Sequence, residues 1–261
     1  MQMPADRERA KNDLIAFYRS EADARDTQQW IEDGEGARVP ESRSAYYFID
    51  RKVSESVAMA EIAPDSKVLE VGSSLGQMSF VLAKRFREVA AVDLSPDCIA
   101  MASRRARHYQ VQNIDFRTAD AEDLSVFPAG TFDGAFSWSV LRYVPDPERA
   151  LHEIFRVLKP GGAAVVDFPN KYCPWFGPVR KIFGIKPHIH DRLFCAREVV
   201  EMMQRVGFVD LEYRHILFTT RRLPERLLPF FKLTDAMLER IPVINRLAAI
   251  ILVRGRKRAE R

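Results

Sequence analysis

Short, nearly continuous apolar runs alternate along this chain with segments in which apolar residues recur at helical spacing. An apolar run of about four to eight residues, bounded by turn formers, is typical of a strand buried on both faces of a sheet. The predicted strands cover residues 67–71, 89–93, 114–119, 132–139, 163–168, 211–218 and 247–255. The predicted helices between them cover 75–87, a segment opened by Ser95 and Pro96, 146–158 and 196–208. These repeated strand–helix units predict an α/β fold with a doubly wound, mostly parallel sheet.

The N-terminal part of the chain lies outside this alternation. Residues 5–20 are predicted to form an exposed amphipathic helix and residues 21–43 a polar loop rich in turn formers. Apolar spacing predicts a second helix over 44–62. We therefore expect an N-terminal helical cap segment at 1–64.

Two insertions interrupt the later strand–helix units. The first, 169–193, is rich in proline and aromatic residues. The second, 219–246, places leucines and phenylalanines between arginines and is predicted to form either a helical cap or a helix at a membrane interface. We expect residues 65–261 to form one domain that carries both insertions.

The turn after the first predicted strand, "VLEVGSSLGQ", differs from a dinucleotide-binding loop, although it joins a buried strand to a helix. The G-x-G-x-x-G pattern of such a loop falls here on Gly72, Ser74 and Gln77, so two of its three glycines are absent. Acidic residues follow three successive predicted strands at Glu70, Asp93 and Asp120. The ends of parallel strands meet at one edge of a sheet. This edge would repel a pyrophosphate, and it suits a ligand with a ribose, an amino group and a positive centre.

Five segments, in order and at the usual spacing, resemble the class I S-adenosylmethionine-dependent methyltransferases, and most of all their small-molecule branch: "VLEVGSSLG", "VDLSPDCI", "ADAEDLSVFPAGTFD", "SVLRYVPDPERALHEIFRVLKPGG" and "MMQRVGF". The resemblance covers about residues 65–218 and the final strand. It implies a seven-stranded Rossmann-like sheet with an antiparallel last strand, and S-adenosylmethionine as the cofactor. By position, the implied cofactor-binding residues are Glu70, Gly72, Ser73, Gly76, Asp93, Leu94, Asp120, Ala121 and Ser137. Ser74 stands where the family usually has a further glycine.

The resemblance implies methyl transfer, and the residues narrow the class of acceptor. Methylation of DNA-base amines in this fold goes with a [D/N/S]-P-P-[Y/F/W] motif, but the corresponding residues 137–140 read "SWSV". The glutamate pair of protein arginine methylation is also absent after that strand. A small, amphipathic acceptor methylated at oxygen is therefore favoured, such as a natural product, quinone, glycolipid or sugar, and no nucleic acid is expected. An N- or C-methyltransferase and a non-catalytic S-adenosylmethionine-binding protein stay open as alternatives.

The candidate general bases lie in "KPHIHDRLF". His190 is the first candidate and His188 the second, because "HDRLF" resembles a His-x-x-x-Phe element of this branch and histidine is the most frequent proton acceptor in such sites. The alternative is that His190 only caps the following helix through Asp191. No cluster of metal ligands is visible, so no metal is expected. The residues expected to border the acceptor are Tyr143, Tyr18 and Trp175.

Charge is distributed unevenly along the chain. The net charge is +4, while residues 221–261 contain 11 Lys or Arg and 4 Asp or Glu, which gives +7 there and −3 elsewhere. A basic C-terminal segment favours a solvated tail or peripheral contact with an anionic membrane. Three widely spaced cysteines predict reduced thiols, no run reaches the length of a membrane span, and the N-terminus lacks the apolar core of a signal peptide. We therefore expect a cytoplasmic protein, with peripheral membrane contact left open and no expectation for its oligomeric state.

Overall fold

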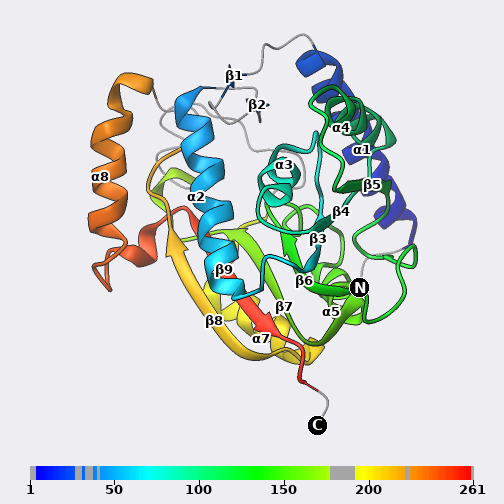
Figure 1. Cartoon of the computed structure of the whole chain (residues 1–261). Helices are drawn as coiled ribbons and strands as arrows, with labels where there is room; N and C mark the ends of the chain where they lie inside the picture. Colours follow the sequence, from blue (N-terminus) through cyan, green and yellow to red (C-terminus); the bar gives the residue numbers. More distant parts are fainter. Residues whose placement is uncertain are drawn as a thin grey trace.

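The sheet of this computed structural model confirms the predicted α/β fold (Figure 1). The structure describes residues 4–26, 31–32, 38–39, 42–176, 192–220 and 224–259. The strands of the main sheet are β3 (Lys67–Val71), β4 (Glu88–Asp93), β5 (Ile114–Thr118), β6 (Phe132–Ser137), β7 (Leu158–Pro169), β8 (Val209–Ile216) and β9 (Ile250–Arg256). They form a seven-stranded sheet in the order β5-β4-β3-β6-β7-β9-β8, in which β9 runs antiparallel to both neighbours and the other pairs are parallel. The antiparallel last strand is therefore confirmed.

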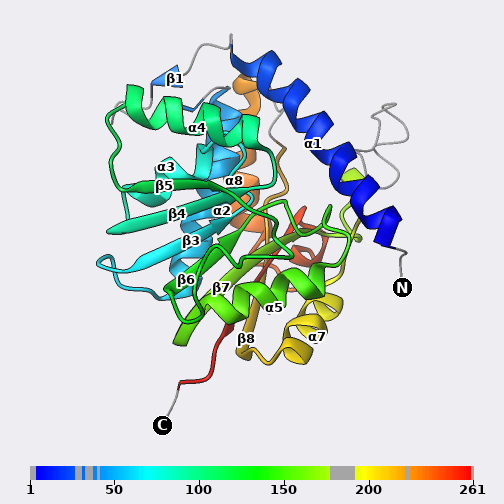
Figure 2. The ribbon, with the colours of Figure 1, turned by 90° about the vertical axis from the view of Figure 1, so that its right-hand side faces the viewer.

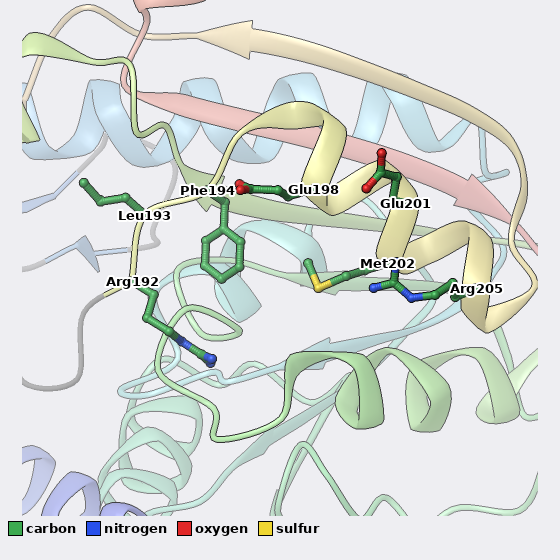
Figure 3. Close-up of a pocket in the computed structure, with 7 residues that line it drawn as sticks. All are labelled: Arg192, Leu193, Phe194, Glu198, Glu201, Met202 and Arg205. Atoms are coloured by element: carbon green, nitrogen blue, oxygen red, sulfur yellow. The ribbon is translucent and has the colours of Figure 1, made fainter. Parts of the chain in front are cut away.

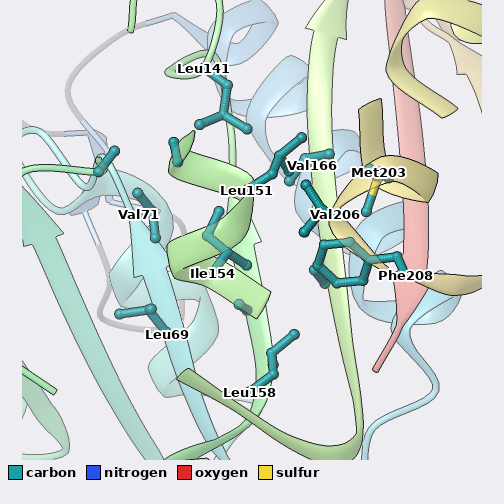
Figure 4. Close-up of a cluster of buried hydrophobic side chains, with 14 of the residues drawn as sticks. Leu69, Val71, Leu141, Leu151, Ile154, Leu158, Val166, Met203, Val206 and Phe208 are labelled. Atoms are coloured by element: carbon teal, nitrogen blue, oxygen red, sulfur yellow. The ribbon is translucent and has the colours of Figure 1, made fainter. Parts of the chain in front are cut away.

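Helices cover both faces of the sheet (Figures 1 and 2). They are α1 (Pro4–Asp26), α2 (Arg43–Ala60), α3 (Gln77–Ala83), α4 (Pro96–His108), α5 (Pro147–Val157), α7 (Ala196–Val206) and α8 (Leu228–Leu238). On one face α5 and α7 bury Leu151, Ile154 and Val206 against the sheet (Figure 4). On the other face α2 and α3 contribute a second core cluster that includes Ile49 and Val53. Because both faces are covered, the strands carry near-continuous apolar runs.

The helix starts read from the sequence are reproduced at the ligand-binding edge. Ser95 caps α4 by accepting a hydrogen bond from the backbone N–H of Cys98 at 3.3 Å, and Pro96 follows it. Asp146 caps α5 in the same way, through the backbone N–H of Arg149 at 3.1 Å. Both helices therefore begin beside the carboxyl ends of the strands, where α/β folds of this kind bind ligands.

The N-terminal segment departs from the prediction. The helix does not end near residue 20 but continues to Asp26, and the predicted loop contains a short antiparallel pair, β1 (Ile31–Glu32) and β2 (Arg38–Val39). The helix α1 is also not simply exposed, because it packs against α4 and buries Leu14 (Figure 2). Its apolar residues form no continuous stripe, so the predicted amphipathic character was wrong and gave no sign of this packing.

The second insertion folds as a helical cap. It contains the short 3₁₀ helices Glu225–Leu227 and Asn245–Leu247 on either side of α8, which lies beside α2 (Figure 1). The described part of the first insertion has one 3₁₀ turn, Pro174–Phe176. The boundary between the N-terminal cap segment and the domain at residue 64 stays a prediction. The helix α2, which precedes this boundary, packs into the core against the sheet. Among the described residues, no helix is both long and apolar enough to cross a membrane.

Candidate cofactor and acceptor site

The turn between β3 and α3 contains three residues with left-handed backbone, Gly72 (φ +85°), Ser74 (φ +47°) and Gly76 (φ +82°). The N–H of Gly72 donates to the carbonyl of Val92 at 2.7 Å, which ties the turn to the end of β4. A Cβ at Gly72 would come within 1.9 Å of a methyl group of Val140, so the turn approaches the β6 side too closely for any other residue. Ser74 holds a conformation that favours glycine, which explains the glycine usual at its position in the resembling family.

Asp93, at the end of β4, is oriented by the same turn. Its carboxylate accepts hydrogen bonds from the N–H of Ser74 at 2.7 Å and from the N–H of Ser95 at 2.9 Å. Burial raises the pKa of Asp93, and the bonds from the backbone N–H groups of Ser95, Ser74 and Leu94 oppose the rise. Each carboxylate oxygen can accept further bonds, so Asp93 is suited to receive two neighbouring hydroxyls of a ribose.

Glu70 is a buried carboxyl on β3, one residue before the strand ends. The hydroxyl of Ser79 donates to its Oε2 at 2.5 Å. Burial raises the pKa of Glu70 to about 8, the Ser79 bond lowers it, and the charge of Asp93 raises it. The buried carboxyl of Glu70 and the half-buried carboxyl of Asp93, at adjacent strand ends, therefore form a site that a positive charge would stabilise.

The acid after β5 is held by a cation from α1. The N–H of Glu122 donates to Asp120 Oδ1 at 2.9 Å, which closes a tight turn. Lys11 Nζ lies 2.5 Å from Asp120 Oδ2 and 2.6 Å from Glu122 Oε2. Arg7, on the same helix, pairs with Asp146 at 2.9 Å. The helix α1 therefore lies across the strand-end edge, and its Lys11 contacts the acid predicted to meet an adenine amine.

The remaining predicted cofactor positions lie along the same edge. Leu94 is half-buried directly after Asp93, and Ala121 is buried in the turn after β5. Ser137 is buried at the end of β6, where its hydroxyl donates to the carbonyl of Val71 at 3.1 Å. These positions and the turn at Gly72 are therefore brought together by four neighbouring parallel strands, β5, β4, β3 and β6.

Two tyrosines connect this edge with the predicted acceptor side. Burial raises the pKa of Tyr18, from α1, above its ordinary range, and the nearby Tyr143 and Asp93 add to the rise. The guanidinium of Arg142 lies over the ring of Tyr143 at 5.1 Å and over the ring of Phe176 at 5.8 Å. Tyr18 and Tyr143 are thus close to each other and to the residue predicted to bind ribose. The candidate bases His188 and His190, and the side chain of Trp175, lie outside the described residues.

Residues 69–166, from β3 to β7, match a family model described as a methyltransferase domain. This match spans every strand end and turn described above, from Glu70 to Ser137. Residues 69–166 are therefore similar to a methyltransferase domain. Proteins of this family use S-adenosylmethionine as the methyl donor.

Relatives with this domain include quinone-modifying enzymes. The chain is 32% identical over 115 residues to the ubiquinone biosynthesis O-methyltransferase of Xanthomonas campestris pv. campestris (strain B100), which covers 44% of this chain and 48% of that relative. It is 30% identical over 155 residues to the chloroplastic 2-methyl-6-phytyl-1,4-hydroquinone methyltransferase 1 of Oryza sativa subsp. japonica, covering 58% of this chain and 43% of the relative. The chain therefore spans about half the length of the curated relatives it matches. The crystal structure of the [4+2]-cyclase SpnF matches 81% of both chains with a TM-score of 0.60 and 23% identity, which shows a shared fold.

The strand-end edge has polar groups that suit S-adenosylmethionine. Ser73 Oγ, in the glycine turn, is buried and has no hydrogen-bond partner among the described residues. A buried hydroxyl without a partner is costly unless a ligand satisfies it. The missing Cβ of Gly72 keeps the turn compact, and the carboxylates of Glu70 and Asp93 complement an amine and a ribose. These residues therefore fit the family's cofactor.

Sequence reasoning missed two contacts at this edge. Lys52, on α2, forms an ion pair with Asp167 on β7, and both side chains are only 1% exposed. Its Nζ also donates to Ser139 Oγ at 2.8 Å, while the N–H of Ser139, which has φ +59°, donates to Asp167 Oδ1. A lysine among the apolar positions of α2 was a signal for this network. Lys11 gave no such signal, because α1 shows no apolar stripe that would predict its packing.

A surface hollow of about 480 Å³ lies away from the cofactor residues, along α7 (Figure 3). Its lining residues are Arg192, Leu193, Phe194, Glu198, Glu201, Met202 and Arg205. None of the predicted cofactor residues lines it. Arg192 also donates to the backbone carbonyl of Arg142 at 3.2 Å, so the hollow borders the loop that carries Tyr143 without belonging to the cofactor site.

Proposed function

We propose that this protein transfers a methyl group from S-adenosylmethionine to a small, amphipathic acceptor, at an oxygen atom. The observation that carries the proposal is the series of Glu70, Asp93 and Asp120 at three neighbouring strand ends, beside a glycine turn that ties β3 to β4. The names of the relatives support a small acceptor methylated at oxygen. The fold alone does not decide the reaction, since one structure of this fold is a cyclase.

The roles proposed for the cofactor residues follow from their chemistry. When bound, S-adenosylmethionine supplies a methyl group on a positively charged sulfur, which is already activated for transfer. Asp93 accepts hydrogen bonds from the ribose hydroxyls, and its orientation is fixed by the N–H groups of Ser74 and Ser95. Glu70 faces the amino end of the ligand, and Asp120 faces the adenine amine. Holding the acceptor oxygen in line with the methyl carbon supplies most of the remaining rate.

His190 is the proposed proton acceptor for the acceptor hydroxyl, with His188 as the second candidate. The support comes from Phe194, four residues after His190. Phe194 forms a β-bridge with Asn170, directly after β7, and its ring packs 4.6 Å from that of Phe168. The chain that leaves the first insertion therefore returns to the strand-end edge, within a few residues of the candidate base. Tyr18, Tyr143 and Trp175 are the residues proposed to border the acceptor.

The domain organisation and the partners are also proposals. Residues 1–64 are proposed to act as a cap on a domain formed by 65–261, which is consistent with the contacts of Lys11 and Arg7 across the strand ends. Peripheral membrane contact is proposed through residues 221–261, where the chain has its excess of positive charge. The only partner proposed within the site is a small acceptor, with no nucleic acid.

Calorimetry tests the cofactor proposal without knowledge of the acceptor. Titrations with S-adenosylmethionine and S-adenosylhomocysteine should show binding, while NADH should not bind. Asp93→Ala should weaken the binding of S-adenosylhomocysteine about 10- to 100-fold, because two ribose hydrogen bonds to a half-buried carboxylate are lost. Asp115→Ala, at an exposed carboxylate on β5, is the matched control and should bind normally. Unchanged binding by Asp93→Ala would contradict the proposed ribose site.

Transfer of the methyl group needs its own measurement. Incubation with labelled S-adenosylmethionine and a panel of phenolic, quinol and sugar acceptors should yield a labelled product, and mass spectrometry then identifies the methylated atom. A product methylated at nitrogen or carbon would replace the O-methyl assignment. Cofactor binding without any product from an acceptor-containing extract would favour a non-catalytic binding protein.

A further inference from the structure

The outer face of α8 is apolar although it faces solvent. Large apolar side chains that are between 41% and 76% exposed gather on this helix and its flanks: Leu227, Phe230, Leu233, Met237, Ile241, Val243 and Leu247. Phe230, Leu233 and Met237 lie on α8 itself at spacings of three and four residues, so they form a stripe along one side of the helix, and the others flank it. In Figure 1, α8 lies at the periphery of the molecule, with α2 on its inner side. A contiguous exposed apolar patch of this kind marks an interaction surface.

The inner side of α8 buries an acid, Asp235, together with the apolar side chain of Leu228. Asp235 is fully buried and accepts hydrogen bonds from the N–H of Phe218 at 2.7 Å and from the hydroxyl of Tyr47 at 3.0 Å. Glu239, one turn later, forms an ion pair with Arg51 of α2 at 2.6 Å. Asp235 of α8 and Glu239 at its C-cap are therefore both directed into the protein, the first held by neutral hydrogen-bond donors and the second by an ion pair. The outer face is left without either of these carboxylates.

Cations surround the apolar stripe. Four basic residues in this segment are exposed: Arg226, Lys232, Arg240 and Arg246. The exposed carboxyl of Glu225 accepts a hydrogen bond from the N–H of Arg43 at 3.0 Å, which directs it toward α2. An apolar stripe flanked by cations complements the boundary between acyl chains and anionic headgroups. A second copy of the chain, docked through the same face, would bring these cations against one another.

The position of α8 connects this face with the acceptor side of the site. Along α2, Arg43 contacts Glu225 just before α8 and Tyr47 contacts α8, whereas Lys52 of the same helix contacts Ser139 and Asp167 at the ends of β6 and β7. The helix α2 therefore contacts both α8 and the ends of these two strands. A partner bound to the outer face of α8 would therefore lie near the edge of the sheet at which the acceptor is expected.

We propose that the outer face of α8 docks onto an anionic lipid bilayer. The apolar stripe enters the headgroup boundary, and the surrounding arginines bind lipid phosphates. An amphipathic acceptor dissolved in that bilayer would then reach the site along its surface. This inference sharpens the proposed peripheral contact of residues 221–261, assigning it to α8 rather than to the basic C-terminal tail. It is independent of methyl transfer, and only the route of the acceptor rests on the proposed function.

Vesicle flotation with the full chain tests the proposal. The protein should float with vesicles of phosphatidylcholine and phosphatidylglycerol, and much less with phosphatidylcholine alone or at high salt. The triple variant Phe230→Gln, Leu233→Gln, Met237→Gln should reduce the membrane-bound fraction about tenfold or more, because three apolar side chains no longer enter the boundary. The double variant Arg226→Ser, Arg240→Ser should weaken binding to the anionic vesicles alone.

The matched control is Val126→Gln, Tyr213→Gln, which changes exposed apolar residues outside α8 and its flanks. It should float like the unmodified protein. Binding of S-adenosylhomocysteine, measured by calorimetry on every variant, shows that each is folded and separates a failure of docking from a failure of the proposed function. Undiminished flotation of the triple variant would overturn the proposal. The proposal would also be overturned if the unmodified protein did not float but formed a dimer that the triple variant abolished. The outer face of α8 would then be a self-association surface.

Discussion

Glu70 should make the stability of this protein fall as pH rises from about 4.5 to about 8. Its pKa is raised from 4.5 to about 8 by burial, with a contribution from Asp93. Between these two pH values the unfolded chain has lost the proton of Glu70 while the folded protein still holds it. Folding then takes up a proton, so the free energy of unfolding decreases as pH increases.

The size of the effect follows from the shift. Each pKa unit corresponds to about 1.4 kcal/mol, so the rise to about 8 corresponds to nearly 5 kcal/mol above pH 8 and about 3 kcal/mol at pH 7. Glu70→Gln removes the titrating group and keeps the shape and an acceptor for the Ser79 hydroxyl. The variant should match the unmodified protein near pH 4.5 and become more stable than it by roughly these amounts at higher pH.

Urea unfolding of both proteins from pH 4.5 to 9 measures the difference directly. Other buried acids, such as Asp235 and Glu239, titrate in both proteins, so the difference curve isolates Glu70. A positively charged ligand should reverse the shift, and binding of S-adenosylmethionine at pH 7 should release close to one proton. Calorimetry in two buffers of different ionisation enthalpy reports that proton. A difference curve that stays flat across this pH range would refute the reasoning.

Two further predictions concern folding at the strand ends. Gly72→Ala should lower the free energy of unfolding by more than about 3 kcal/mol, because its Cβ would overlap Val140 and its φ is +85°. Gly130→Ala is the control, because Gly130 has φ +65° but open space around it, and it should cost only about 1 kcal/mol. If urea unfolding gave the same loss of free energy for both variants, the predicted clash would be contradicted. Lys52→Met should cost about 3–5 kcal/mol by leaving Asp167 buried without its cation. The double variant Lys52→Met, Asp167→Asn should recover most of that loss, and strictly additive losses in a double-mutant cycle would show that the two residues do not form a pair.

Local sequence was sufficient for the sheet and for most of the cofactor edge. Strands covered by helices on both faces must be apolar throughout, so each of them stood out as a run. The residues at the strand ends lie within a few positions of those runs. Parallel pairing of the strands then brings them to one edge of the sheet, regardless of the conformation of the loops. Glu70, Gly72 and Asp93 could therefore be placed at this edge from the sequence, and the resemblance to the methyltransferases added Ser137. The backbone conformation of Ser74 could not be predicted from the sequence. Its left-handed conformation and its hydrogen bond to Asp93 depend on how the turn packs against β4.

The contacts that close the site depended on the tertiary structure. Lys11 meets Asp120 across 109 positions of sequence, and Lys52 meets Ser139 across 87, so no local pattern connects them. The second insertion likewise shows a feature that local sequence could not predict. Its alternation of apolar and basic residues predicted a helix, but only packing decided that Asp235 and Glu239 face inward and the apolar stripe outward. The sequence by itself determined the strands, the turn and the acids that follow from periodicity. The tertiary structure decided which charges meet and which apolar face stays open, because these depend on contacts between segments far apart in the chain.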